Sequence, residues 1–339
     1  MAGLPIVLLV HGMGTHPLDN MTREFKAGLS EAAKGFNIKE FDIDEHMELV
    51  EFNYSETLDN IRKKLAKEAK GILDQFEVLP DNQLLERLLK FEANLDEDEF
   101  IYTHWLDVLL YGGAYYGEKI RVELANKING LLKRVKGAQV HIIAHSLGTA
   151  VVHDTLEKLY RAEATPGDNI PDLKPGVDSI YCLWTFANVS RMVDILNGVT
   201  PDETIVRSGP NGCTHTMYNI RHELDPFTWY KTYKPDIEHG RNFVNNVVRV
   251  KNTHSFQEYV ADPEVAQYLL LELTDLQEPK LSKNLEDCKK AHRKTSLNGM
   301  YDKIDAATKK LRKGDVESIA DLMVAIDAFE DKVKALKED

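Results

Sequence analysis

Apolar residues in this chain gather in short runs that alternate with longer amphipathic stretches. Residues 4–10 form a continuous apolar run, which is typical of a strand buried on both faces of a parallel sheet. A short β-branched run within residues 139–144 leads directly into Ser146 and a helix-forming stretch. In all, six strands are predicted, near residues 5, 50, 141, 182, 219 and 247. The sequence therefore predicts an α/β fold with a mostly parallel six-stranded sheet, joined by right-handed crossovers and flanked by helices.

Helical periodicity fills the intervals between the predicted strands. It predicts helices over residues 118–135, 149–161 and 257–270. Between residues 55 and 117, leucines at helical spacing are followed by an aromatic stretch with paired glycines. These residues either form a helical cap or lid over the sheet edge or pack on the sheet as part of its core.

The last part of the chain differs in character from the rest. We expect one main domain over residues 1–278 and a charged helical extension over residues 279–339. Residues 316–336 form an amphipathic helix whose apolar stripe needs a partner. That partner is either the same chain or a second copy, so a homo-oligomer formed through the C-terminal helices is one prediction.

The candidate chemistry starts at Ser146, which lies where a predicted strand turns into a helix. A tight turn there lifts the hydroxyl out of the backbone and exposes it, with the positive end of a helix beneath it. Such a turn needs small residues two positions before and two after the serine, and Ala144 and Gly148 meet that need. This corner predicts that Ser146 is a nucleophile.

A glycine loop follows the first predicted strand. His11-Gly12-Met13-Gly14 brings bare backbone N–H groups to the sheet edge, which is the donor geometry that an oxyanion hole requires. The loop lacks the Gly-Lys-Ser or Gly-Lys-Thr ending of a nucleotide site. We therefore interpret it as a loop that binds an oxyanion rather than a phosphate.

The glycine loop and the segment Ala144-His145-Ser146-Leu147-Gly148 together resemble the α/β-hydrolase fold, and within it the lipase-like serine esterases. The resemblance covers roughly residues 4–275, with Ala144 in place of the usual glycine. Of the strands that the family usually has before the loop, we expect two to be without a counterpart in this sequence. It implies a catalytic triad in the order Ser, Asp or Glu, His. The residues that it assigns around the substrate are the oxyanion-hole amides of Met13 and Leu147 and the substrate-binding residues His11, Gly12, Gly14 and His145.

His254 is the predicted general base, because among the six histidines after Ser146 it alone lies in the loop between the last predicted strand, residues 246–251, and a helix. Asp225 is the predicted acid, since Asp-Pro follows a strand and the proline stiffens the turn that presents the carboxylate. Glu223 is the alternative acid. Some lipases carry the acid after the preceding strand, but that position holds Asn188.

These residues predict a serine hydrolase that cleaves a carboxylic ester or thioester through an acyl-enzyme on Ser146, with no cofactor and no metal. The expected substrate is a small acyl ester or a lipid-like molecule. Two alternatives stay open: an acyltransferase with the same triad, and a non-catalytic binding protein on a hydrolase scaffold.

Composition limits the classes of partner and location. The 339 residues are 43% hydrophobic, which suffices for one sizeable core, and the net charge of −13 disfavours nucleic acids and anionic membranes. No apolar stretch reaches the roughly 20 residues of a membrane span, and the first apolar run lacks the flanks of a signal peptide. Three scattered cysteines suggest neither a disulfide framework nor a zinc ribbon, so we expect a cytoplasmic protein.

Overall fold

The computed structural model describes residues 3–12, 19–55, 57, 114–134, 139–161, 173–177, 180–191, 204–229, 232–250, 252–297, 302 and 305. Most of the predicted insertion over residues 55–117 lies outside these described residues. So does the whole amphipathic helix predicted over residues 316–336.

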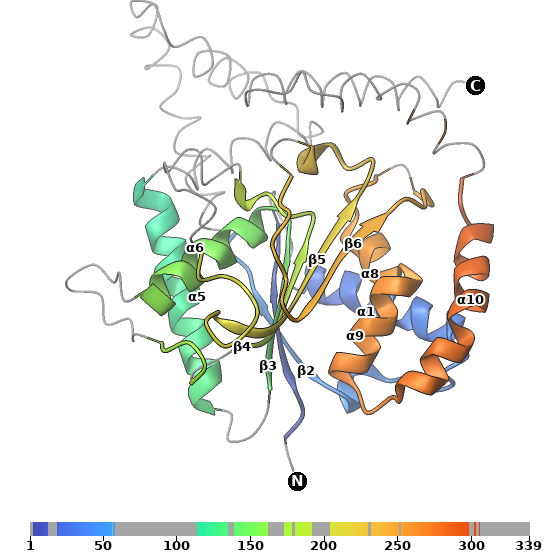
Figure 1. Cartoon of the computed structure of the whole chain (residues 1–339), viewed down its shortest axis with the longest axis horizontal. Helices are drawn as coiled ribbons and strands as arrows, with labels where there is room; N and C mark the ends of the chain where they lie inside the picture. The colour runs from blue at the N-terminus through green and yellow to red at the C-terminus, as the bar shows by residue number, and fades with distance from the viewer. Residues whose placement is uncertain are drawn as a thin grey trace, which may run out of the picture.

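A six-stranded sheet forms the centre of the molecule, and every neighbouring pair of strands is parallel (Figure 1). The strand order is β2-β1-β3-β4-β5-β6, which places β1 and β3 side by side in the interior of the sheet and β6 at one edge. The predicted six-stranded α/β fold is therefore confirmed. The strands are β1 (Ile6–Val10), β2 (Glu48–Phe52), β3 (Val140–His145), β4 (Ile180–Phe186), β5 (Thr214–His222) and β6 (Gly240–Asn245).

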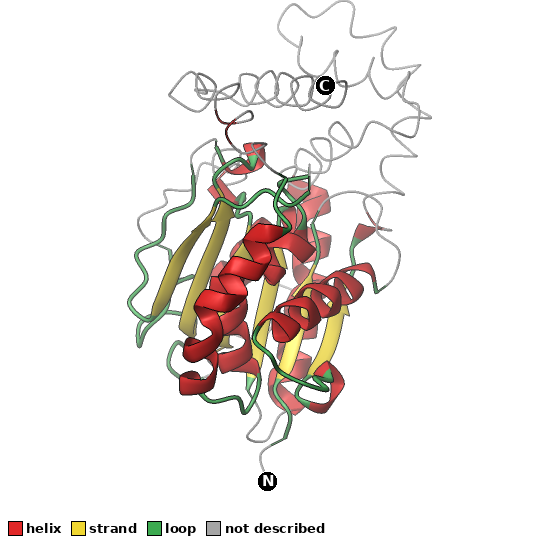
Figure 2. Cartoon of the chain, turned by 90° about the vertical axis from the view of Figure 1, so that its right-hand side faces the viewer, coloured by secondary structure: helices red, strands yellow, loops and turns green. Residues whose placement is uncertain are grey.

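Helices cover both faces of the sheet (Figures 1 and 2). One face carries α5 (Ala114–Arg134) and α6 (Leu147–Arg161). The other carries α1 (Asn20–Gly35), α8 (Phe256–Ala261), α9 (Pro263–Leu273) and α10 (Glu278–Lys294). Two short 3₁₀ helices, η1 (Ile43–Glu45) and η3 (Pro226–Thr228), complete the described elements.

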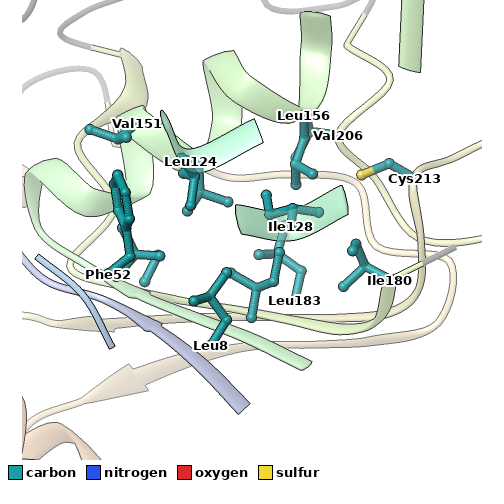
Figure 3. Packing of buried hydrophobic residues seen from close by; sticks show 14 of the residues in the cluster. Leu8, Phe52, Leu124, Ile128, Val151, Leu156, Ile180, Leu183, Val206 and Cys213 are labelled. Atoms are coloured by element: carbon teal, nitrogen blue, oxygen red, sulfur yellow. The ribbon is translucent and has the colours of Figure 1, made fainter. Parts of the chain in front are cut away.

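Strand β1 is apolar throughout because helices cover both faces of the sheet around it. Along β1, Leu8 points toward α5 and α6, where it joins the cluster drawn in Figure 3, whereas Val7 and Leu9 belong to the cluster on the opposite face. All three side chains are fully buried. A strand buried on both faces has no polar side to display, which explains the continuous apolar run in the sequence.

Helix α1 has no counterpart among the elements predicted from the sequence. Its buried residues Met21, Phe25 and Leu29 recur every fourth position, so they form one apolar stripe that packs against α8 and α10. Helix α10, the first part of the predicted charged extension, buries Leu281 and Cys288 in the same cluster. The extension therefore begins with a helix that is docked on the sheet domain.

The strand predicted over residues 246–251 is wrong in position, because β6 precedes it at Gly240–Asn245. The valines after β6 look like a strand in the sequence, yet Val250 is exposed. Val248 turns inward, and its carbonyl accepts the N–H of Leu297 at 2.9 Å. The strand itself is polar because it lies at the sheet edge, with only Phe243 and Asn245 buried. Within the described residues, no helix is long and apolar enough to cross a membrane.

Candidate functional site

Ser146 lies at the turn between β3 and α6. Strand β3 is an interior strand of the sheet, with β1 on one side and β4 on the other. Its backbone has φ +55°, a left-handed conformation that non-glycine residues adopt at a cost. A Cβ at Gly148 would lie 2.3 Å from the carbonyl oxygen of His11, and a Cβ at Gly12 would lie 2.8 Å from the Cβ of Ser146. The backbone of the turn is therefore in close contact with the end of β1. This contact explains why a small residue is needed at Gly148. Ser146 itself is only 1% exposed, so the expectation of an exposed hydroxyl is wrong.

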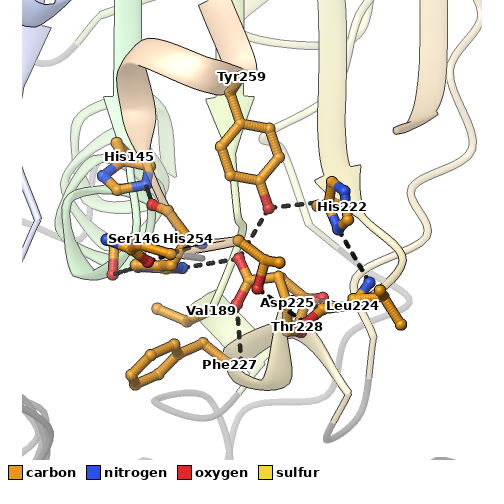
Figure 4. Close-up of polar contacts among 12 residues, drawn as sticks. His145, Ser146, Val189, His222, Leu224, Asp225, Phe227, Thr228, His254 and Tyr259 are labelled. Atoms are coloured by element: carbon orange, nitrogen blue, oxygen red, sulfur yellow. Dashed lines mark hydrogen bonds and ion pairs between the residues drawn. The ribbon is translucent and has the colours of Figure 1, made fainter. Parts of the chain in front are cut away.

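His254 connects Ser146 to Asp225 through both ring nitrogens (Figure 4). Its Nε2 lies 2.8 Å from Ser146 Oγ, and its Nδ1 lies 2.7 Å from Asp225 Oδ2. A serine hydroxyl that donates to Nε2 and an Nδ1–H that donates to the carboxylate fit the neutral ring. All three residues are buried. The structure thus brings together the three side chains predicted as nucleophile, base and acid, which are far apart in the sequence.

Asp225 is held at the start of η3, where it is the N-cap residue and Pro226 is the first residue of the helix. Its Oδ1 accepts the Phe227 N–H at 3.0 Å, while Oδ2 faces His254. Proline suits the first position of a helix because it has no N–H to satisfy there, which gives the Asp-Pro pair a structural reason. Of the two acids considered, Asp225 rather than Glu223 accepts from His254.

Several contacts hold the loop that carries His254. The Thr253 hydroxyl donates to the carbonyl of Leu224 at 2.9 Å, which ties this loop to the segment before Asp225. The Asn252 side chain accepts the His254 N–H at 3.0 Å, and His145 donates from Nε2 to the His254 carbonyl at 3.1 Å. His145, predicted to bind substrate, therefore contacts the loop that carries the predicted base.

Gly12, the first glycine of the predicted loop, is held by His11, which is buried just after β1. Its Nδ1 donates to the Gly12 carbonyl at 2.6 Å, and its Nε2 accepts the Tyr54 N–H at 3.0 Å. The Tyr54 ring stacks on the imidazole at 4.4 Å, and its hydroxyl donates to the His11 carbonyl. His11, predicted to bind substrate, thus links Gly12 to the residues that follow β2. Gly12 lies against Ser146, whereas Met13 and Gly14 lie outside the described residues.

Leu147, predicted to donate in an oxyanion hole, is the first residue of α6. The first amides of a helix have no acceptor within the helix, so they can bind an anion. The side chain of Leu147 is fully buried, which leaves its backbone N–H as the group that could act at this corner.

Two residues near Asp225 were not predicted. The Tyr259 hydroxyl donates to Asp225 Oδ2 at 2.7 Å and accepts the His222 N–H at 2.9 Å. Burial, and then the charge of Asp225, raise the pKa of Tyr259 well above its usual value. Burial lowers the pKa of His222, although Asp225 opposes that shift. The sequence marks Tyr259 as a helix residue five positions after His254, but it gives no sign of which face it occupies.

The cysteines offer no second nucleophile. Cys182, Cys213 and Cys288 are free and buried, and burial raises the pKa of Cys213 to about 12 and that of Cys288 to about 11. Their thiols therefore stay protonated and unreactive at neutral pH. In the part of the chain that the structure describes, no group of three or more His, Cys, Asp or Glu side chains is arranged to hold a metal ion.

Comparisons with known proteins add no family to this picture. No protein-family model matches the chain, and no curated protein is significantly similar to it in sequence.

Proposed function

We propose that this protein is a serine hydrolase of the α/β-hydrolase type, similar to lipase-like esterases, that cleaves a carboxylic ester or thioester. The observation that carries the proposal is the continuous hydrogen-bonded line from Ser146 Oγ through His254 to Asp225, with distances of 2.8 and 2.7 Å. Nucleophile, base and orienting acid in mutual contact are what acyl transfer to a serine requires.

In the proposed reaction, His254 Nε2 takes the proton of Ser146 as Oγ attacks the acyl carbonyl. Asp225 stabilises the imidazolium that forms. The tetrahedral intermediate collapses as His254 gives the proton to the leaving alcohol or thiol, which leaves an acyl-enzyme on Ser146. Water, deprotonated by the same histidine, then releases the acid and restores the free hydroxyl.

The negative charge that develops on the carbonyl oxygen of the substrate needs hydrogen-bond donors close to Ser146. The N–H of Leu147, at the start of α6, is suited to this role, and the dipole of α6 favours an anion at that end. Met13 is the second donor in the proposal, because it follows Gly12 in the chain and Gly12 lies against the serine.

The backbone of Ser146 supports a catalytic rather than a purely structural role. A left-handed serine that is closely packed by Gly12 and Gly148 stores strain, and such strain gathers at functional sites. A scaffold used only for binding has no need of a serine in that conformation, and still less of a buried histidine and carboxylate aligned on its hydroxyl.

The test is hydrolysis of p-nitrophenyl esters of graded acyl length, together with labelling by a fluorophosphonate probe. Ser146→Ala is expected to lower hydrolysis by at least about a thousandfold and to abolish labelling, since the attacking atom is gone. Ser208→Ala is the matched control, because Ser208 is also buried and its hydroxyl accepts the His239 N–H, a backbone contact remote from the proposed triad in the described residues. Labelling that persists in Ser146→Ala would contradict the assignment of the nucleophile.

A further inference from the structure

Asp225 Oδ2 accepts two hydrogen bonds from opposite partners. One comes from His254 Nδ1, and the other from the hydroxyl of Tyr259, both at 2.7 Å (Figure 4). Tyr259 is 2% exposed and Asp225 is fully buried, so water does not compete for this contact. The proposed triad thus continues into a fourth side chain.

The tyrosine can act only as a donor toward the carboxylate. Its oxygen already accepts the N–H of His222 at 2.9 Å, so the hydroxyl proton points to Asp225. The raised pKa of Tyr259 keeps that proton in place at neutral pH. The contact is therefore a fixed feature of the site.

Tyr259 also belongs to the helix that follows His254. Helix α8 begins two residues after the histidine, and its Phe256 and Tyr259 rings pack against Phe186 at the end of β4. The hydroxyl of Tyr259 therefore ties the acid after β5 to the helix directly behind the base.

We propose that Tyr259 is a positioning residue of the site: its hydroxyl fixes the orientation of the Asp225 carboxylate and shares its charge, so that Oδ2 meets His254 Nδ1. This inference rests on the function proposed above. Without the hydroxyl, the carboxylate charge is concentrated on His254, which favours the protonated ring, and the carboxylate is free to rotate.

Other titratable groups near the pair must be considered in any pH experiment. His145 lies against His254, with ring centroids 4.7 Å apart. His222 faces Asp225, and burial lowers its pKa, although the charge of Asp225 opposes that shift. Glu223 and Arg221 also act on this neighbourhood through their charges. Of these groups, His222 contacts the Tyr259 hydroxyl, and it does so through its backbone N–H rather than its ring. A change in the pH profile of Tyr259→Phe therefore reports on Asp225 and His254.

The experiment compares Tyr259→Phe with the wild type in the full chain. The variant keeps the buried ring and loses only the hydroxyl. We expect kcat/KM to fall about tenfold, mainly in kcat, since one hydrogen bond to a charged group is lost at the reacting centre. The acid limb of the pH profile of kcat/KM is expected to move to higher pH. The midpoint of the His254 ring signals in an NMR titration should move in the same direction.

Tyr218→Phe is the matched control. The Tyr218 hydroxyl also donates to a carboxylate, that of Glu272 at 2.8 Å, and its ring is buried in the sheet, but it does not contact the proposed triad. This variant is expected to leave the pH profile and the NMR midpoint of His254 unchanged. In an Asp225→Asn background, Tyr259→Phe should have no further effect on the midpoint, because the tyrosine acts through the carboxylate.

The outcomes separate the inference from the proposed function. A folded Tyr259→Phe protein whose acid limb and NMR midpoint both match the wild type overturns the inference. A wild-type protein that neither hydrolyses esters nor reacts with a fluorophosphonate overturns the function, whereas the NMR midpoint still decides the role of Tyr259.

If Tyr259→Phe does not fold, 3-fluorotyrosine at position 259 replaces it. Its more acidic hydroxyl should shift the midpoint to lower pH, and an unchanged midpoint would again overturn the inference.

Discussion

The interior of the sheet and its β6 edge hold their parts of the site by different means. Ser146 follows β3, between β1 and β4, and backbone packed against backbone fixes its position. Asp225 and His254 follow β5 and β6, and side-chain hydrogen bonds from residues such as Thr253 and Tyr259 hold them. In such a site the position of Ser146 is rigid, whereas those of Asp225 and His254 can adjust when a side-chain contact is lost.

The difference predicts how each region responds to substitution. Backbone packed at van der Waals contact has no room to relax, so a single added methyl group shifts a whole turn. A side-chain hydrogen bond contributes about 1 kcal/mol to stability, and its loss changes the geometry by degrees. Substitutions in the interior should therefore either leave the turn intact or disrupt it completely. Substitutions at the edge should have graded effects on stability and activity.

The largest effect is expected for Gly148→Ala. The new Cβ would lie 2.3 Å from the carbonyl oxygen of His11 and 2.4 Å from that of Val10, and neither backbone can withdraw without breaking the end of β1. We expect a loss of roughly 3 kcal/mol or more in the free energy of unfolding, together with loss of hydrolysis. Urea denaturation measures the first and p-nitrophenyl ester assays the second.

Gly130→Ala on α5 provides the control, because a Cβ there meets nothing within 4 Å. It should stabilise the protein by up to about 1 kcal/mol, since alanine is the better helix former. If the two variants were equally stable, close backbone packing would not be what fixes the Ser146 turn.

The second effect concerns a polar group in the interior of the sheet. His141 on β3 is fully buried, neither ring nitrogen has a hydrogen-bond partner among the described residues, and burial lowers its pKa to about 3. In the unfolded chain a histidine binds its proton near pH 6.5, whereas the folded protein excludes that proton down to about pH 3. Stability is therefore lost as pH falls from about 6.5 toward 3.

His141→Leu should remove this contribution. At pH 4 the variant is expected to gain on the order of 3 kcal/mol relative to the wild type, beyond any difference at pH 8. Chemical denaturation at both pH values measures the gain. An identical pH dependence in the two proteins would show that His141 takes up its proton without unfolding.

The smallest effect is expected at the edge, for Thr253→Val. The substitution preserves shape and removes the hydrogen bond to the Leu224 carbonyl. It should cost about 1 kcal/mol in the free energy of unfolding and lower kcat/KM severalfold while the protein stays folded. Thermal unfolding and steady-state kinetics check both. A loss of folding as severe as that expected for Gly148→Ala would erase the proposed distinction between interior and edge.

The sequence predicts the interior of the fold better than its edges. Strands β1 and β4 are continuous apolar runs because both of their faces are buried, so their positions are clear from the sequence. Strand β6 buries only two side chains, so it has little apolar pattern. The valines that follow it match the apolar pattern of a strand better than β6 itself. Helix α1 carries a regular apolar stripe that was available in the sequence but was not among the predicted elements.

The site divides in the same way. Ser146 has a local signature, because the turn dictates which neighbours fit. Asp225 and His254 were predicted from their places after strands and, for Asp225, from the proline that follows it. Tyr259 could not be predicted, since its role depends on how α8 is rotated against the sheet. His11 and His145 stand beside recognisable motifs, yet their contacts to Tyr54 and to the His254 carbonyl arise only from packing between distant segments.

Because the backbone of Ser146 is left-handed, the residue that the proposed activity requires at position 146 lowers the stability of the fold. A side chain in that conformation costs on the order of 1 kcal/mol, a strain that glycine would not carry. If the proposed function is correct, the sequence that folds best and the sequence that reacts differ at residue 146. Improvements in stability must then come from elsewhere in the chain, and α5, where Gly130 has open space, is one such place.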